Sequence, residues 1–245
     1  MPTPHDQPAE VLVLQHLPDD GPGYLGHWLD AHAIPWHVFC ADAGEAYPAS
    51  VSAYKGMAVL GGEWSANDDR PSLRHAESLM READALGVSI IGHCLGGQLM
   101  ARAFGGKVGR AVQPEIGWMP LQTGDSEASE RWFGASDTHT AYQWHRDSFV
   151  TLPPGAELIA RSPACAHQAF AFGPHLGMQF HIEITAEKIA LWMGEPGASF
   201  PRMVKRWPDS VQKVEAMTAE TKVHLARSHE LANRIYGAWK AVWRG

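Results

Sequence analysis

Short runs of apolar residues alternate with longer segments of helical spacing in the first part of the chain. Four of these runs are predicted strands: residues 11–15, 36–40, 57–61 and 88–92. Strands that are apolar at every position are typical of a sheet whose two faces are both covered by helices. Helices are expected over 23–33 and over 71–86, where Pro71 suits a first helical position. The repeated strand–helix order therefore predicts an α/β fold with a doubly wound, mostly parallel sheet and helices on both faces.

Beyond Phe104 the pattern changes to shorter apolar runs separated by Gly, Pro and Asp. Further strands are predicted at 107–112, 140–144, 157–161, 168–171 and 177–181. From Thr185 onward the spacing is helical, and Leu231, Ile235, Ala238 and Val242 share one helical face. We therefore expect one domain over residues 1–190 and a C-terminal helical extension over 191–245 that packs on it.

Composition narrows the classes of function. The 245 residues are 45% hydrophobic and carry a formal charge of −7, without a basic patch, so neither disorder nor nucleic-acid binding is expected. No apolar run approaches the roughly 18 residues of a membrane span, and the N-terminus lacks signal-peptide features. Three cysteines without a CxxC pair argue against a disulfide scaffold or a cysteine zinc site. We expect a cytoplasmic protein with no membrane contact, no metal and no other cofactor.

A glycine-rich turn follows the predicted strand at 88–92. Its sequence, GHCLGGQ at 92–98, places Cys94 between a buried strand and a helix predicted at 99–104. A nucleophile in such a strand-to-helix turn projects at the C-terminal edge of the sheet, where α/β folds build their sites. The helix N-terminus favours a thiolate, and the backbone N–H of Leu95 would face an oxyanion. The alternative is a small core residue in a tight turn, the structural role that we expect for Cys40 and Cys165.

A cysteine nucleophile needs a base, and His181 is the candidate. It lies in GMQFHIE at 177–183, with Glu183 two residues further on. In an extended segment residues i and i+2 face the same side, so the carboxylate would orient the imidazole. Taken alone, the pair reads as solvated groups at a strand end; together with Cys94 it predicts a catalytic triad. His93, which points the opposite way in such a turn, is expected to be structural.

The motifs GHCLGGQ and QFHIE together resemble the class I glutamine amidotransferases, triad enzymes with a flavodoxin-like fold. Within that family the chain looks more like the stand-alone members akin to the amidotransferase domain of GMP synthase. Matching motifs also occur between and before these two: GGEWSAND at 61–68, EIGW at 115–118, WHRD at 144–147 and QAF at 168–170. With the first predicted strand, the resemblance covers residues 11–183.

The resemblance implies a reaction and a role for each matching residue. Cys94 would attack the side-chain amide of glutamine, giving a γ-glutamyl thioester and ammonia, and hydrolysis would then release glutamate. His181 would transfer the proton between the nucleophile and the leaving group, and Glu183 would orient the His181 imidazole. The remaining implied residues are two oxyanion-hole donors, Gly62 and Leu95, and three substrate-binding residues, Gln98, Trp144 and His145.

Three residues depart from the family pattern. Ile182 stands where relatives have Pro, which leaves the His–Glu segment less rigid. Glu63 replaces the Pro of a GGP motif, and its carboxylate would either repel a glutamate-like ligand or recognise an additional amine. Arg146 replaces a small residue and would narrow the pocket.

The segment after Glu183 is too short for an ATP-dependent synthase module, and the chain has no phosphate-binding glycine motif. The expected partner is therefore a separate ammonia-acceptor synthase, or the enzyme hydrolyses glutamine or a γ-glutamyl compound for its own sake. A γ-glutamyl peptidase or γ-glutamylamine hydrolase using the same triad is the alternative enzyme. A non-catalytic binding or regulatory protein is the alternative of another class.

Overall fold

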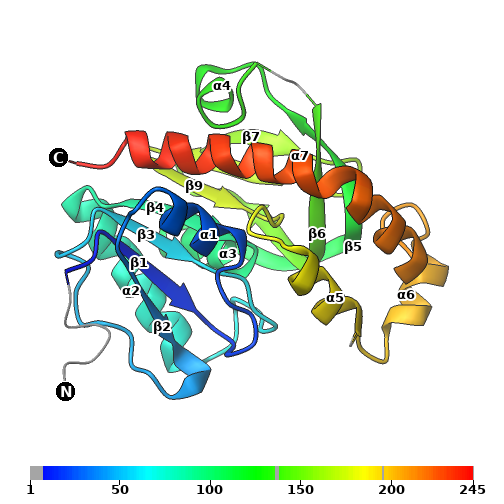
Figure 1. The fold of residues 1–245 in the computed structure, drawn as a ribbon, viewed down its shortest axis with the longest axis horizontal. Helices are drawn as coiled ribbons and strands as arrows, with labels where there is room; N and C mark the ends of the chain where they lie inside the picture. Colours follow the sequence, from blue (N-terminus) through cyan, green and yellow to red (C-terminus); the bar gives the residue numbers. More distant parts are fainter. Residues whose placement is uncertain (1–7, 136–137, 195, 245) are drawn as a thin grey trace.

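A nine-stranded sheet forms the centre of the computed structural model, which describes residues 8–135, 138–194 and 196–244 (Figure 1). The strand order is β2–β1–β3–β4–β9–β8–β7–β5–β6. Pairings from β2 to β9 are parallel, and those from β9 to β6 are antiparallel. In chain order the strands are β1 (Val11–Gln15), β2 (Trp36–Cys40), β3 (Gly56–Val59), β4 (Ser89–His93), β5 (Lys107–Thr123), β6 (Thr138–Thr151), β7 (Glu157–Arg161), β8 (Ala169–Phe172) and β9 (His175–Met178).

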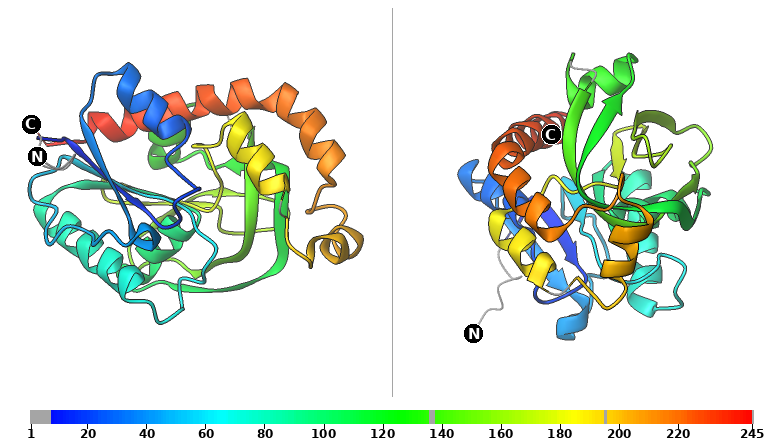
Figure 2. Two further views of the ribbon diagram at one scale, coloured as in Figure 1. Left: turned by 60° about the horizontal axis from the view of Figure 1, so that its bottom comes forward. Right: turned by 90° about the vertical axis from the view of Figure 1, so that its right-hand side faces the viewer.

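Helices cover both faces of the parallel part of the sheet (Figure 2). The helices are α1 (Tyr24–Ala31), α2 (Pro71–Leu86), α3 (Leu95–Ala103), α4 (Glu127–Phe133), α5 (Ala186–Gly194), α6 (Phe200–Arg206) and α7 (Val214–Ala241), with a 3₁₀ turn at Ala41–Ala43. On β1, Val11 and Val13 pack in the core under α1 and α7, whereas Leu12 and Leu14 pack in the core under α2 and α3. Burial on both faces explains why this strand is apolar throughout. The predicted α/β architecture is confirmed.

The antiparallel part differs most from the expectation. The predicted strands at 107–112 and 140–144 are pieces of a long β5–β6 hairpin, and α4, which was not predicted, lies in its connection. Pro114 and Pro120 break the apolar pattern of β5, and the register shifts between Arg110 and Glu115. Gly117 adopts a φ of 108° where any Cβ would collide with Gln212. Prolines, a bulge and a left-handed glycine hide a strand from pattern analysis.

The last quarter of the chain is helical, as expected. Helices α5 and α6 and the start of α7 enclose a third apolar core against the β5–β6 hairpin, which includes Tyr142, Phe200 and Met217. Further along, α7 buries Ile235 and Trp239 in the main core. Residue 190 lies inside α5, so the expected limit between domain and extension falls within a helix. Among the described residues, no helix combines the length and apolarity needed to cross a bilayer.

Candidate active site

Cys94 lies in a tight elbow between β4 and α3. Its φ of 48° and ψ of −107° place it in a region that residues with a side chain rarely adopt, and it is 6% exposed. A Cβ on Gly96 would collide with the Val59 carbonyl oxygen. A Cβ on Gly97 would lie 2.5 Å from the Met178 carbonyl oxygen, which is also too close. The glycines therefore let α3 begin directly against the sheet, at Leu95, four residues before its predicted start. This packing holds the strained cysteine in place.

His181 and Glu183 come from the segment after β9. That strand ends at Met178, so the expectation of a strand over 177–181 places its end too late. The segment bends, and a backbone hydrogen bond from His181 to the Tyr142 carbonyl fixes it at 2.9 Å. The Nδ1–H group of His181 donates to Oε1 of Glu183 at 2.6 Å. The orienting contact expected from the sequence is therefore present.

The imidazole of His181 also lies beside Cys94. Both side chains lie against Gly61. A Cβ added to this glycine would be 3.1 Å from Cε1 of His181 and 3.6 Å from Cβ of Cys94, so the imidazole and the cysteine side chain are neighbours. Nε2 of His181 is buried and has no hydrogen-bond partner among the described residues. The elbow and the bent segment thus bring together the three side chains predicted as a triad.

Electrostatics favour a charged His181–Glu183 pair. Burial disfavours the imidazolium, but the Glu183 carboxylate and, to a lesser degree, the Cys94 thiol outweigh it and raise the pKa of His181 to about 10. Burial likewise disfavours the Glu183 carboxylate, yet the adjacent His181 holds its pKa well below the usual range. A stabilised imidazolium can hold a neighbouring thiolate as an ion pair.

Behind this pair, His93 is fully buried, as expected for a structural residue. Its Nε2 atom lies 4.0 Å from Oε2 of Glu183 and 3.3 Å from the hydroxyl of Tyr236 on α7. Burial lowers the pKa of His93, against the raising effect of Glu183. A neutral His93 and the α7 tyrosine thus form the rear wall of the site.

The two expected oxyanion-hole residues lie next to each other. A Cβ on Gly62 would come within 2.9 Å of Leu95 Cδ2. Leu95 is the first residue of α3, where backbone N–H groups have no acceptor within the helix. Such free donors beside the thiol can stabilise negative charge on a substrate oxygen.

Gln98 contacts the rest of the site through its side-chain amide. Its Nε2 group donates to the Asp147 carbonyl at 3.1 Å and to Oε1 of Gln179 at 3.0 Å. Gln179 in turn donates from Nε2 to Sγ of Cys94 at 3.5 Å. Gln179 was not among the predicted site residues. Its place two residues before His181 in the QFHIE motif was the available signal.

His145 lines the cavity, and both of its ring nitrogens belong to a buried polar network behind the wall. Its Nε2 and Nδ1 atoms lie 3.1 Å from Glu115 Oε2 and from the Asp147 carbonyl oxygen, respectively. Ser162 and Gln168 also donate to Glu115, at 2.6 Å each. The EIGW, WHRD and QAF motifs therefore meet in one network that supports the pocket wall.

The same network contains one group of potential metal ligands in the described part of the chain. Ligand atoms of Glu115, His145 and Cys165 lie within 4.8 Å of one another, all buried. Cys165 is also 2.9 Å from the Ser148 hydroxyl. Since hydrogen bonds already engage these groups, the geometry fits a structural network, in keeping with the structural role expected for Cys165.

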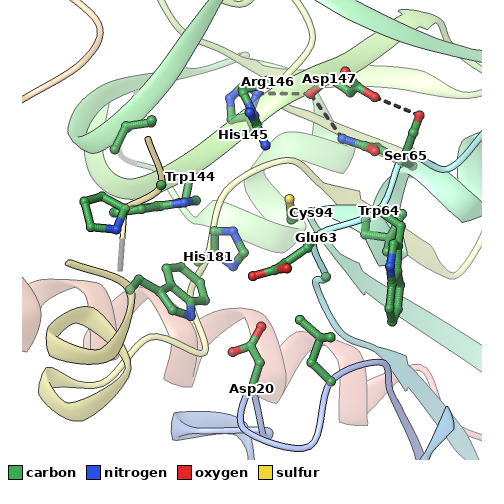
Figure 3. A pocket seen from close by; sticks show the side chains of 18 of the residues that line it. Asp20, Glu63, Trp64, Ser65, Cys94, Trp144, His145, Arg146, Asp147 and His181 are labelled. Atoms are coloured by element: carbon green, nitrogen blue, oxygen red, sulfur yellow. Dashed lines mark hydrogen bonds between the residues drawn. The ribbon is translucent and has the colours of Figure 1, made fainter. Parts of the chain in front are cut away.

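A cavity of about 490 Å³ opens above Cys94 and His181 (Figure 3). Trp144 lines it and stacks on Phe200 of α6, with ring centroids 6.3 Å apart. Trp192 of α5 meets His181 edge-on at 4.8 Å. The cavity walls thus include side chains from both the β5–β6 hairpin and the C-terminal helices. Trp192 was not predicted, because helical periodicity alone does not show which helix will cover a site.

The three departures from the family pattern occupy different environments. Ile182 is fully buried in the main core, while its neighbours His181 and Glu183 keep their 2.6 Å contact. Glu63 and Arg146 are exposed at the cavity, on different sides of Cys94 (Figure 3). Ile182 therefore fills space, whereas Glu63 and Arg146 change the charge of the pocket.

This fold and this arrangement of groups are those of an α/β enzyme with a cysteine nucleophile. The family model for "Glutamine amidotransferase class-I" matches residues 36–190, and the chain belongs to that family. It is 33% identical over 132 residues to a glutamine-hydrolysing GMP synthase subunit of Thermococcus kodakarensis, covering 53% of this chain and 69% of that protein. The Pyrococcus abyssi protein of the same name is 34% identical over 119 residues, or 46% and 62% of the two chains.

Solved structures extend the similarity beyond the family domain. A glutamine amidotransferase from Methylobacillus flagellatus superposes with a TM-score of 0.90 at 33% identity, covering 97% of this chain and 96% of that one. A glutamine amidotransferase from Thermotoga maritima gives a TM-score of 0.78 at 24% identity, over 95% and 98% of the two chains. The helices after residue 190 are therefore part of a fold that other proteins share.

Proposed function

We propose that this protein hydrolyses the side-chain amide of glutamine, or of a γ-glutamyl compound, through a thioester on Cys94. The observation that carries the proposal is the convergence of the strained Cys94 elbow with the buried His181–Glu183 pair at the floor of an open cavity. Family membership supports glutamine as the source of the γ-glutamyl group.

In the proposed reaction Cys94 attacks the γ-carbonyl carbon while the backbone N–H groups of Leu95 and Gly62 stabilise the oxyanion. His181, oriented by Glu183, gives its Nε2 proton to the departing nitrogen, and the C–N bond breaks. A water molecule, deprotonated by His181, then cleaves the thioester and releases glutamate. Gln98, Trp144 and His145 are proposed to form the wall that holds the amino-acid end of the substrate, with His145 acting through its buried network.

A second candidate is hydrolysis of a γ-glutamyl peptide or γ-glutamylamine. Side chains after residue 190, including Trp192 and Met203, help enclose the cavity, which therefore has room and walls for a group larger than ammonia. An intact site argues against the alternative of a non-catalytic binding protein.

The relatives that are named as GMP synthase subunits suggest a partner for the first candidate. A separate synthase protein that accepts ammonia is the proposed partner if glutamine is the substrate. We place the protein in the cytoplasm, since its three cysteines are all free and buried, which fits a reducing compartment.

Release of glutamate and of the amine from a panel of γ-glutamyl amides tests the proposal. Wild-type protein should release both from at least one member of the panel, and Cys94→Ala should release neither. The matched control is Cys40→Ala, which removes a buried thiol outside the cavity and should keep the activity. Hydrolysis that survives in Cys94→Ala would refute the assignment.

A further inference from the structure

The cavity above Cys94 carries opposite charges on its two sides (Figure 3). Arg110 and Arg146 line it together with Asp147, and Arg110 pairs with Asp147 at 3.3 Å. Within the described structure, Arg146 is therefore the positive charge on this side of the cavity that has no ion-pair partner. Glu63 and Asp20 lie on the other side (Figure 3), and Asp19 also lines the cavity.

Pairing removes part of the negative charge. Asp20 is buried and accepts a hydrogen bond from Nζ of Lys188 at 2.5 Å, so these two groups neutralise each other. Glu63 and Asp19 are exposed at the cavity and have no salt-bridge partner within the described ranges. Glu63 and Asp19 are therefore two carboxylates of the cavity that no ion pair neutralises, and Glu63 is the one on the side of Asp20.

The reaction geometry decides which part of a substrate faces this acidic side. In the proposed mechanism the departing nitrogen must lie against Nε2 of His181, the buried atom that lacks a partner in the described structure. His181 lies between Trp144 and Glu63 in Figure 3, with Asp20 beyond Glu63. Since Trp144 is proposed to hold the amino-acid end of the substrate, a substituent on that nitrogen would extend to the opposite side, toward Glu63.

Apolar surface flanks the acidic groups. Trp192 meets the His181 ring edge-on at 4.8 Å, and Leu191 and Leu17 also line the cavity. Hydrocarbon beside carboxylates suits an alkyl chain that ends in an ammonium group, because the chain is desolvated while the charge keeps an ionic partner.

We propose that the leaving-group side of the cavity binds an organic cation, so that the preferred substrate is a γ-glutamyl amide of a diamine. This inference rests on the proposed function. Attack by Cys94 forms the thioester bond, and the amide C–N bond breaks as the nitrogen takes the proton from His181. The products are a diamine, whose distal ammonium group contacts Glu63, and, after hydrolysis, glutamate.

Three substrates of similar length isolate the charge: the γ-glutamyl amides of 1,4-diaminobutane, of n-pentylamine and of 4-aminobutyrate. They present a cation, a methyl group and a carboxylate at the same distance from the amide. The expected order of kcat/KM is diamine, then pentylamine, then aminobutyrate. Glu63→Gln should lower the diamine-to-pentylamine ratio by about three- to tenfold, since a partly exposed ion pair is lost.

Glu157→Gln is the matched control, because Glu157 is an exposed carboxylate of β7 outside the cavity; it should leave the ratio unchanged. If Glu63 instead binds the α-ammonium group of the glutamyl moiety, Glu63→Gln lowers all three rates equally and the ratio stays constant. That result overturns the inference while the proposed function stands. The same holds if the wild-type enzyme has equal kcat/KM values for the three amides. If neither glutamine nor any of the amides is cleaved, the proposed function fails and this inference fails with it.

Discussion

The side-chain amide of Gln179 donates a hydrogen bond to Sγ of Cys94 across 3.5 Å. The donor is fixed because Oε1 of Gln179 accepts from Gln98, which also holds the Asp147 carbonyl. Both glutamines are almost fully buried. An anchored N–H donor that points at a sulfur atom stabilises the thiolate more than the thiol.

Gln179→Leu should therefore weaken the nucleophile. A hydrogen bond to a charged group contributes about 1.5–3 kcal/mol, so kcat/KM should fall by roughly ten- to a hundredfold. The rate at which iodoacetamide alkylates Cys94 should fall as well. Gln143→Leu is the control, because Gln143 is buried and its amide atoms have no partner in the described structure. An unchanged alkylation rate in Gln179→Leu would show that the amide does not act on the sulfur.

Glu183→Gln should change how stability depends on pH. The folded-state pKa of His181 is raised to about 10, so its stabilisation is fully present below its ordinary value of 6.5 and is lost as the pH rises toward 10. The lowered pKa of Glu183 stabilises the fold above its ordinary value of 4.5, and this contribution is lost as the pH falls. Removing the carboxylate should reduce stability near neutral pH and flatten the decline between pH 6.5 and 10. Urea denaturation at pH 6.5 and 9.5 measures both effects, and an equal decline in the two proteins would contradict the pairing.

Gly96→Ala should damage the elbow through the backbone. The added Cβ would collide with the Val59 carbonyl oxygen, and relief of this overlap requires α3 to move away from β3. We expect a loss of about 1–3 kcal/mol or more in the free energy of unfolding. Gly237→Ala on α7 is the control; its Cβ meets nothing within 4 Å, and it should stabilise the protein by about 0.5–1 kcal/mol. Thermal denaturation of the two variants should therefore shift in opposite directions.

Trp239→Ala tests whether the C-terminal helix is part of the main core. Trp239 is fully buried, and its indole N–H donates to the Ser89 carbonyl at 3.2 Å. Truncation should cost about 3–5 kcal/mol of stability. Val223→Ala, at a 61% exposed position of the same helix, should cost little. Equal midpoints in urea for the two variants would mean that residues 191–245 are an independent appendage.

The parallel half of the fold and the convergence of Cys94 with His181 and Glu183 could be predicted from sequence because local signals carry them. A strand buried on both faces is apolar throughout, as β1 is, and a Gly-x-Cys-x-Gly elbow needs its glycines for steric reasons. The β5–β6 hairpin lacked such a signal, because Pro114 and Gly117 interrupt its alternation. The start of α3 was placed too late because Gly96 and Gly97 are poor helix formers that the close packing nevertheless requires.

Contacts made by long-range packing could not be predicted. Trp192 reaches His181 only because α5 folds back over the hairpin, and helical spacing gives no information on that approach. Tyr236 reaches His93 from 143 positions away. The family resemblance assigned His145 to the substrate wall, but only the structure shows that the buried Glu115 network engages its ring.

The late position of α7 in the chain has a consequence for biosynthesis. Tyr236 and Trp239 of α7 cover one side of β4, the strand that leads to Cys94. The indole N–H of Trp239 donates to the carbonyl of Ser89, 150 positions earlier. Until those residues leave the ribosome, β4 lacks that cover and its hydrophobic surface is open to the solvent. A nascent chain therefore completes the support of its reactive sulfur only after α7 has been translated, well after the nucleophile itself.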